Sequence, residues 1–153
     1  MRIERVRKYF KEEGIADKIQ EFDVSSATVE LAAKALGVEG QRIAKTLSFR
    51  KDDSCILVVT AGDMRIDNSK FKKTFGMKAK MLSPDEVISY TGYQIGGVCP
   101  FDIDNEISIY LDKSLQRFTT VFPACGSSNS AIELDLDELL RYSNAKEWVD
   151  VCK

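Results

Sequence analysis

The spacing of hydrophobic and polar positions changes between a helical and a strand-like period several times along the chain. Apolar residues recur every three or four positions in five segments, and a capping residue or a glycine marks most of their ends. These segments are predicted to be helices: residues 3–14, 27–37, 68–76, 84–92 and 137–145. Ser25 and Ser26 are expected to cap the second helix, and a short helical turn is expected over 39–44.

Strand-like patterns fill most of the remaining chain. The segment 55–62, which contains an unbroken apolar run, is typical of a strand buried on both faces. Shorter runs predict further strands at 17–24, 45–49, 78–82, 107–111, 119–123, 131–136 and 146–151. Because helices and strands mix without strict βαβ repetition, the pattern favours an α+β fold on a mixed, largely antiparallel central sheet flanked by helices. Without a repeat or linker, residues 1–153 are expected to form a single domain.

Lys45 is the unusual residue of this pattern. It stands at the start of a predicted strand, where period-two alternation places it on the same face as Leu47 and Phe49. This position fits a surface lysine at a frayed strand start. It also fits a cation that forms the floor of a pocket on the sheet.

Composition excludes several kinds of chemistry. The 153 residues include no histidine, so mechanisms with a Ser-His or Cys-His nucleophile are excluded. The four cysteines are widely spaced, which favours reduced thiols over disulfides or a zinc site, and neither a metal nor a cofactor is expected. The longest apolar run, 56–59, is too short to cross a membrane, and no secretory segment follows Met1. A cytoplasmic location is therefore expected.

The net charge of −2 hides a local excess of positive charge. The segment 65–80 carries six basic residues against a single aspartate: Arg65, Lys70, Lys72, Lys73, Lys78 and Lys80. Such a run is either a solvated face or a patch that contacts phosphates of a polyanion.

Two irregular segments carry further candidate chemistry. Residues 91–101 contain Gly96, Gly97 and Pro100, and residues 123–131 place small polar side chains after a glycine. Taken singly, each is most simply a turn. Together with Lys45 they offer a positive charge and backbone N–H donors without an acid–base pair. Such a site suits a small polar or anionic substrate whose leaving group is already good, because fixed donors then stabilise the developing charge.

Four motifs in order resemble the YbaK/prolyl-tRNA-synthetase-associated family, the stand-alone trans-editing deacylases. The first is the segment 25–50, with Ala-Lys-Thr-Leu around Lys45, and the second is AGDMRID at 61–67. The third is the Gly-x-x-x-Pro loop from Gly96 to Pro100. The fourth is CGSSNSAIEL at 125–134.

The resemblance implies an α+β editing domain that hydrolyses the ester of a mischarged aminoacyl-tRNA. Lys45 and Gly96 would be the catalytic residues, with water or a ribose hydroxyl of the substrate taking part. The substrate-binding residues would be Thr46, Gly97, Val98, Cys99, Pro100, Gly126, Ser127, Ser128 and Asn129. The basic residues expected to contact tRNA are Arg65, Lys70, Lys72 and Lys73. The partners implied are the acceptor end of tRNA and, as a candidate, prolyl-tRNA synthetase.

Three questions stay open at this point. A non-catalytic sensor or adaptor that binds aminoacyl-tRNA or an amino acid would use the same residues. A thiol-based redox protein would use Cys99 and Cys125, although nothing nearby in sequence lowers a thiol pKa. The amino acid removed, cysteine, alanine or a similar small one, and its tRNA, tRNA(Pro) or another, are also open, since small side chains differ by only about 1–3 kcal/mol in an apolar pocket.

Overall fold

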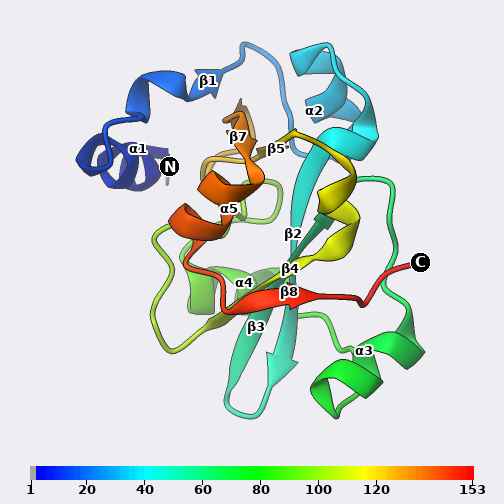
Figure 1. The fold of residues 1–153 in the computed structure, drawn as a ribbon. Coiled ribbons are helices and arrows are strands. Elements are labelled where there is room, and N and C mark those ends of the chain that lie inside the picture. The colour runs from blue at the N-terminus through cyan, green and yellow to red at the C-terminus, as the bar shows by residue number, and fades with distance from the viewer. Residues whose placement is uncertain (1–2) are drawn as a thin grey trace.

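The computed structural model describes residues 3–153 as helices packed around a mixed β-sheet (Figure 1). The α-helices are α1 Ile3–Glu12, α2 Val29–Leu36, α3 Asn68–Phe75, α4 Pro84–Thr91 and α5 Leu136–Ser143. The 3-10 turns are η1 Ala16–Lys18, η2 Gly40–Arg42 and η3 Lys113–Arg117. The strands are β1 Gln20–Glu21, β2 Ile43–Lys51, β3 Ser54–Ala61, β4 Ser108–Asp112, β5 Thr120–Pro123, β6 Ser130–Ala131, β7 Leu134–Asp135 and β8 Glu147–Val149. Within residues 3–153, every helix is too short or too polar to cross a membrane.

The central sheet has the strand order β7-β5-β2-β3-β4-β8, and β1 pairs with β6 in a small second sheet. The β2–β3 and β5–β7 pairs are antiparallel, whereas β2–β5, β3–β4 and β4–β8 are parallel. The predicted α+β class and mixed sheet are confirmed, with more parallel pairing than the sequence indicated. Long connections such as the one from β3 to β4, which carries α3 and α4, allow a strand to return in the same direction.

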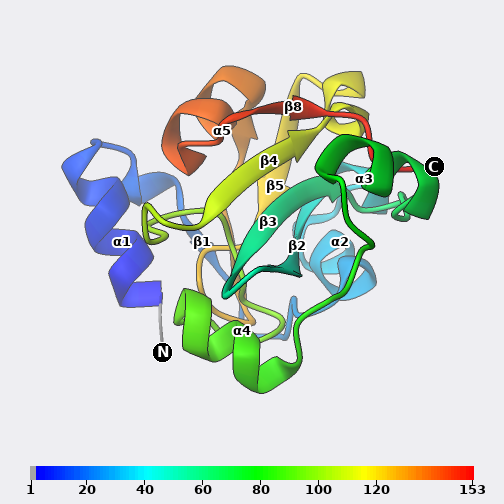
Figure 2. The same ribbon diagram turned by 90° about the horizontal axis from the view of Figure 1, so that it is seen from below.

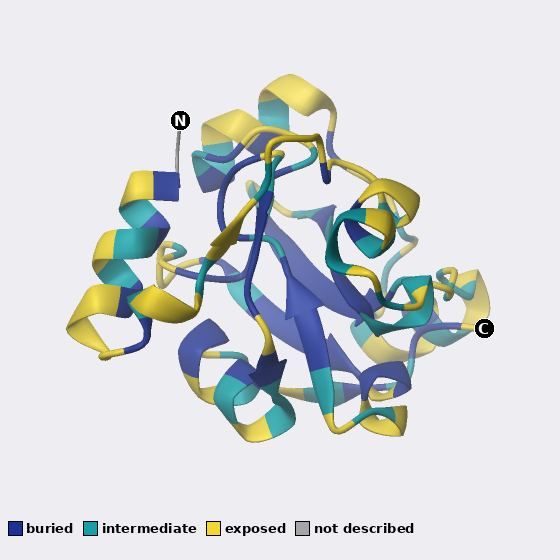
Figure 3. Ribbon diagram, turned by 90° about the horizontal axis from the view of Figure 1, so that it is seen from above, coloured by how far each residue is buried: buried dark blue, intermediate teal, exposed yellow. Residues whose placement is uncertain are grey.

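The sheet separates two apolar layers because the side chains of β3 alternate between its faces. Leu57 and Val59 pack in the layer that includes buried residues of α1, α4 and α5. Ile56 and Val58 point to the other face and pack with Phe71 of α3. Figure 2 shows α1 and α5 on one side of the strands and α2 and α3 on the other. Figure 3 shows the central strands buried and the outer faces of the helices exposed.

The helices follow the sequence pattern closely, with one correction at an N-terminus. Ser83 forms the predicted capping box with Glu86, and Pro84 opens α4. The cap of α2 is Thr28, whose side chain accepts a hydrogen bond from the Leu31 N–H at 3.2 Å, so the predicted cap at Ser25-Ser26 is wrong. Ser26 is thereby free to serve another purpose.

The short strands depart most from the prediction. Residues 78–82 form no strand, and only an isolated bridge joins Met81 to Phe49 of β2. The segments 17–24 and 131–136 contain strands of two residues each. These pieces pair for only one or two residues each, too few to form the longer strands that the sequence predicted.

A candidate pocket at an open strand edge

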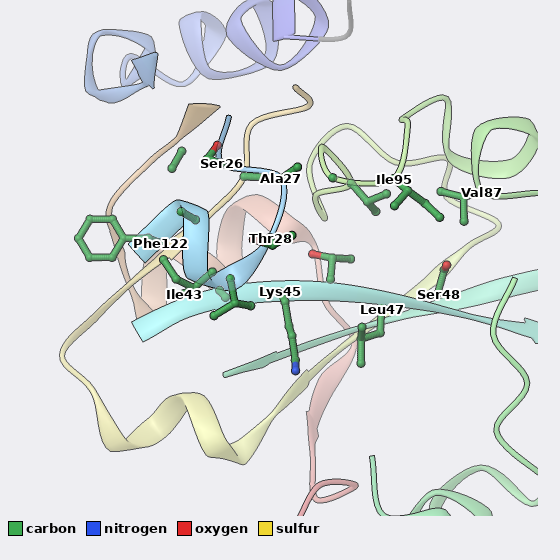
Figure 4. Close-up of a pocket in the computed structure, with 18 of the residues that line it drawn as sticks. Ser26, Ala27, Thr28, Ile43, Lys45, Leu47, Ser48, Val87, Ile95 and Phe122 are labelled. Atoms are coloured by element: carbon green, nitrogen blue, oxygen red, sulfur yellow. The ribbon is translucent and has the colours of Figure 1, made fainter. Parts of the chain in front are cut away.

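A cavity of about 210 Å³ lies along the edge of β2, between α2, α4 and the loop that follows α4 (Figure 4). Its lining is mainly apolar. The residues that surround it are Ser26, Ala27, Thr28, Val29, Ala32, Ile43, Ala44, Lys45, Thr46, Leu47, Ser48, Met81, Leu82, Val87, Ile95, Gly96, Val98, Phe122, Ala124, Ser130 and Ala131.

The cavity exists because one edge of β2 lacks a neighbouring strand over a short stretch. The pairing of β5 with β2 extends only as far as Ala44. The next neighbour along this edge is the segment 80–82, which meets β2 at Ser48, whose carbonyl accepts from the Leu82 N–H at 3.2 Å. The N–H and C=O of one residue in a strand point to the same edge, and residues two apart share that edge. The backbone groups of Thr46 therefore face the gap, as does the N–H of Ser48.

Two hydroxyl groups in the cavity wall have no hydrogen-bond partner among residues 3–153. They are Ser26 Oγ, on a side chain whose residue is 8% exposed, and Thr46 Oγ1. A buried hydroxyl without a partner costs free energy, about 1–3 kcal/mol, unless a ligand or water satisfies it. Both groups lie in the same cavity, which indicates that its occupant is polar on at least one side.

Lys45 lines the cavity, but its ammonium group does not face the glycine loops. Figure 4 shows the side chain leaving β2 on the side opposite to Ala27, Thr28 and Ile95. Its Nζ donates to the Met64 carbonyl at 2.6 Å and to the Gly62 carbonyl at 3.4 Å. Burial lowers the pKa of this ammonium from its ordinary value. The face predicted from alternation is correct, whereas the expected ammonium floor of a glycine-walled cleft is wrong, because the loops cover the opposite face and edge.

The turn that accepts the Lys45 ammonium is itself held in place. A Cβ at Gly62 would overlap the Gly40 carbonyl oxygen and approach Val29, so the turn packs directly on η2. Asp63 binds Arg117 with both carboxylate oxygens, at 2.6 and 3.1 Å, and this partner lowers the pKa of Asp63. The motif at 61–67 thus forms the support of Lys45.

The loop after α4 forms one wall of the cavity through Gly96 and Val98. Gly96 has φ +95°, and a Cβ there would lie 2.9 Å from the Ala27 side chain. The Gly97 N–H already donates to the Gln94 carbonyl at 3.0 Å. The Gly96 N–H has no backbone acceptor among residues 3–153, which leaves it available to a ligand.

The predicted site residues divide between two hollows. Lys45, Thr46, Gly96 and Val98 line the strand-edge cavity. A second hollow of about 310 Å³ lies behind the loop, and its predicted members are Gly97, Gly126, Ser127 and Ser128. The two loops meet there, since a Cβ at Gly97 would lie 2.9 Å from the Ser127 backbone.

The remaining predicted substrate-binding residues have structural contacts instead. Cys99 and Pro100 are buried. Asn129 donates from its side-chain amide to the Phe22 carbonyl at 3.0 Å and ties the loop to the N-terminal segment.

All four cysteines are buried and free. Burial raises the pKa of Cys99 to about 12 and that of Cys125 well above its ordinary value. A thiol with a raised pKa is a poor nucleophile at neutral pH, so these residues do not fit a redox site.

The predicted tRNA-contacting residues lie on or beside α3. Lys72 and Lys73 are exposed near its C-terminal end, and Arg65 is exposed just before the helix. Lys70 is paired with Asp150 at 3.0 Å. The positive charge of Lys70 is therefore offset by its ion pair, whereas the other three basic side chains are exposed to solvent.

The sequence did not indicate most of the cavity wall. The sequence predicted that Ser26 caps a helix. The structure shows that Thr28 is the cap and that Ser26 lines the cavity instead. Met81 and Ile95 are 59% exposed each and form an apolar rim. Single exposed apolar residues are common on protein surfaces and carry no signal in a sequence.

Comparisons with known proteins agree on one family. The sequence model of the family described as "Aminoacyl-tRNA editing domain" matches residues 23–142. The chain is 55% identical, over all of its length and 98% of the relative's, to the uncharacterized protein YwhH of Bacillus subtilis. It is 28% identical, over 78% of its length and 74% of the relative's, to an Enterococcus faecalis protein that bears the provisional name Cys-tRNA(Pro)/Cys-tRNA(Cys) deacylase EbsC. It is also 30% identical, over 81% of its length, to 22% of the proline–tRNA ligase of Thermosipho melanesiensis.

A solved structure gives the same result. It is described provisionally as a trans-editing enzyme for prolyl-tRNA synthetase and superposes with a TM-score of 0.88 at 29% identity, covering 99% of this chain and 96% of the other. A second crystal structure, of the hypothetical protein APE2540, superposes with a TM-score of 0.80 at 28% identity, covering 93% and 98% of the two chains. The sequence match and the shared fold extend over the strand edge, the glycine loop and the cavity between them, and the chain belongs to the aminoacyl-tRNA editing domain family.

Proposed function

We propose that the chain is a trans-editing hydrolase that removes a small amino acid, such as cysteine or alanine, from a mischarged tRNA. The observation that carries the proposal is the strand-edge cavity, which combines apolar walls with hydroxyl groups at Ser26 and Thr46 that have no hydrogen-bond partner in the described part of the chain. Its volume of about 210 Å³ is below the range of about 300–1,000 Å³ typical of pockets for larger ligands. A small aminoacyl group matches this size and polarity.

The reaction would rely on backbone donors and on the substrate itself. The Gly96 N–H, which has no backbone acceptor among residues 3–153, and the edge N–H of Thr46 would hold the ester carbonyl as negative charge develops on its oxygen. A preorganised donor of this kind contributes about a hundred- to a thousandfold in rate. Water, assisted by a ribose hydroxyl of the substrate, would attack the carbonyl carbon, and the tRNA hydroxyl would leave with the proton.

Lys45 would act from behind the strand edge. Its ammonium is fixed on the Gly62 and Met64 carbonyls, where it holds the turn against β2 and adds positive charge near the cavity. In a partly buried site, such a charge favours the anionic transition state. The exposed residues Arg65, Lys72 and Lys73 would contact the tRNA phosphates, and prolyl-tRNA synthetase is a candidate partner. A tRNA substrate also places the reaction in the cytoplasm.

A deacylation panel tests the proposal. Cysteinyl-, alanyl- and seryl-tRNAs are incubated with the wild-type protein, with Lys45→Met and with Lys51→Met. Lys45→Met keeps the side-chain length and removes the charge, whereas Lys51 ends the same strand and does not line the cavity. We expect release of at least one amino acid by the wild type and Lys51→Met, and a loss of at least a hundredfold in Lys45→Met.

Two results contradict the proposal. If none of the three aminoacyl-tRNAs is hydrolysed, the assigned reaction is wrong. If an aminoacyl-tRNA binds saturably in a Lys45-dependent way without release, the chain is instead a sensor or adaptor.

A further inference from the structure

Helix α1 lies outside the matched residues 23–142, yet it contacts both ends of the glycine loop. The Arg5 guanidinium donates from Nε to Asp102 Oδ2 at 2.8 Å and from Nη1 to the Thr91 carbonyl at 3.0 Å. Its Nη2 also donates to the Asp102 carbonyl. Thr91 ends α4, before the loop, and Asp102 follows Phe101 at the loop's exit. One side chain therefore bridges the two points between which the loop is suspended.

Aromatic contacts strengthen the same junction. The Arg5 guanidinium lies over the Tyr93 ring, 4.9 Å from its centre, and the Tyr93 hydroxyl donates to the Phe101 carbonyl at 2.6 Å. Phe10, one and a half turns further along α1, packs edge-on against Phe101 with ring centres 4.8 Å apart. Helix α1 thus fixes the backbone just before and just after the segment 94–100.

The loop backbone is shaped around this guanidinium. A Cβ at Gly92 would lie 2.6 Å from Arg5 Nη1, so a larger residue there would displace the guanidinium from its present position. Asp102 has φ +53°, a left-handed conformation that costs free energy in residues other than glycine. The carboxylate and the carbonyl of Asp102 both accept from Arg5, which accounts for the retention of this conformation.

We propose that Arg5 is a positioning residue that holds the Gly96 loop in its place against the strand-edge cavity. The proposal rests on the proposed function for its catalytic consequence. Arg5 touches the ends of the loop and not the cavity, so it would act through the placement of Gly96. A misplacement of about 1 Å can reduce a rate by about a hundredfold. Since phosphate contacts elsewhere would supply tRNA affinity, the loss is expected in kcat and not in KM.

The test compares Arg5→Ala with Arg7→Ala on the same helix. Arg7 pairs with Glu21, and within residues 3–153 it has no hydrogen bond or ion pair with the loop; its side chain is 41% exposed against 31% for Arg5. We expect at least tenfold faster amide hydrogen exchange over residues 93–101 in Arg5→Ala. We also expect a ten- to hundredfold lower kcat on the aminoacyl-tRNA that the wild type hydrolyses, with KM changed less than threefold. Arg7→Ala should match the wild type in all three measurements.

Two further variants separate positioning from general destabilisation. Val149→Ala removes buried apolar contacts of β8 in the other apolar layer and lowers overall stability while α1 and Arg5 remain, so exchange of the loop through local opening and kcat should hold. Arg5→Lys keeps the charge but loses the planar fork that reaches Thr91 and Asp102 together, so it should recover only part of kcat.

Loop exchange that is unchanged in Arg5→Ala overturns the proposal. So does faster exchange with an unchanged kcat in a protein that deacylates. If the wild type hydrolyses no aminoacyl-tRNA, the proposed function fails, and the exchange measurement still decides whether Arg5 holds the loop.

Discussion

At the scale of single residues, the unpartnered hydroxyl of Ser26 predicts opposite effects on stability and activity. Ser26→Ala removes a buried polar group without a partner among residues 3–153, so the free energy of unfolding should rise by about 1 kcal/mol. The same change removes a polar contact from the cavity, so kcat/KM for deacylation should fall several-fold. Urea unfolding and a deacylation assay measure the two effects.

Ser130→Ala is the matched control for Ser26→Ala. Ser130 Oγ is also buried and lines the same cavity, but it shares a 2.6 Å hydrogen bond with Ser127 Oγ. Removal of this hydroxyl should lower the free energy of unfolding by about 1 kcal/mol. A decrease in the free energy of unfolding for both variants would mean that the Ser26 hydroxyl has a hydrogen-bond partner in the folded protein.

The buried thiols predict slow alkylation and a decline of stability in alkali. Burial raises the pKa of Cys55 to about 11 and that of Cys152 to about 12. The unfolded chain releases these protons first, so the contribution of the two thiols to the free energy of unfolding should be constant below about pH 8 and fall as the pH rises toward 11 and 12. At pH 8, iodoacetamide should modify the native protein at least about a hundredfold more slowly than the urea-unfolded chain.

Rapid modification of a native thiol would contradict this expectation. Mass spectrometry identifies the residue that reacts. Rapid reaction at Cys99 or Cys125 would reopen the thiol-based hypothesis, because both lie in loops beside the cavity.

The residue that attracted attention in the sequence shows what alternation can and cannot predict. The period-two pattern placed Lys45 on the face of Leu47 and Phe49, and Figure 4 shows Lys45 and Leu47 leaving β2 on the same side. The carbonyl partners of the ammonium come from the turn after β3, and no local pattern indicates where that turn lies. Strand faces follow from local spacing, whereas contacts between distant segments depend on the whole topology.

At the scale of elements, the two predicted loops act as one packed unit. A Cβ at Gly97 would lie 2.9 Å from the backbone of Ser127, so Gly97→Ala must separate the loops. We expect a decrease of about 1–3 kcal/mol in the free energy of unfolding and at least a tenfold lower deacylation rate. Thermal unfolding and single-turnover deacylation measure these changes.

Gly76→Ala serves as a control with a similar cost and no effect on the site. Gly76 ends α3 with φ +72°, and a Cβ there would meet open space. The substitution should cost about 1–2 kcal/mol through backbone strain alone and leave deacylation unchanged. A parallel decline of activity in both variants would show that activity follows stability and not the packing of the two loops.

The elements with strong local signals agree with their predictions, and the weakly signalled ones do not. The capping box at Ser83 and the glycine after α3 act within one helix turn, and both helices form as expected. Residues 78–82 alternate like a strand, but they meet β2 only where β5 has already left it. The gap between these two partners creates the cavity, and it depends on which strands are neighbours, which local pattern does not reveal.

At the scale of the whole molecule, the placement of charge matters more than its sum. The net charge is −2, yet the exposed basic residues 72 and 73 sit together on α3. Figure 2 shows α3 on the opposite side of the strands from α1, whose lysines are also exposed. If the α3 side contacts tRNA, its positive charge would orient the bound tRNA. The exposed lysine pairs on α3 and on α1 allow the contributions of the two sides to tRNA binding to be compared directly.

The paired substitution Lys72→Glu and Lys73→Glu should weaken tRNA binding in a salt-dependent way. Each phosphate contact releases bound counterions, so the slope of log affinity against log salt should decrease by about 1 for each phosphate that the variant no longer binds. The matched pair on the other side, Lys8→Glu and Lys11→Glu, carries the same change in net charge and should leave the slope unchanged. Filter binding of deacylated tRNA between about 50 and 200 mM salt measures the slope.

Because Lys72 and Lys73 do not line the cavity, kcat at saturating substrate should be preserved in the α3 pair. An equal slope for both pairs would mean that the α3 side is a solvated surface and that tRNA approaches the cavity from elsewhere.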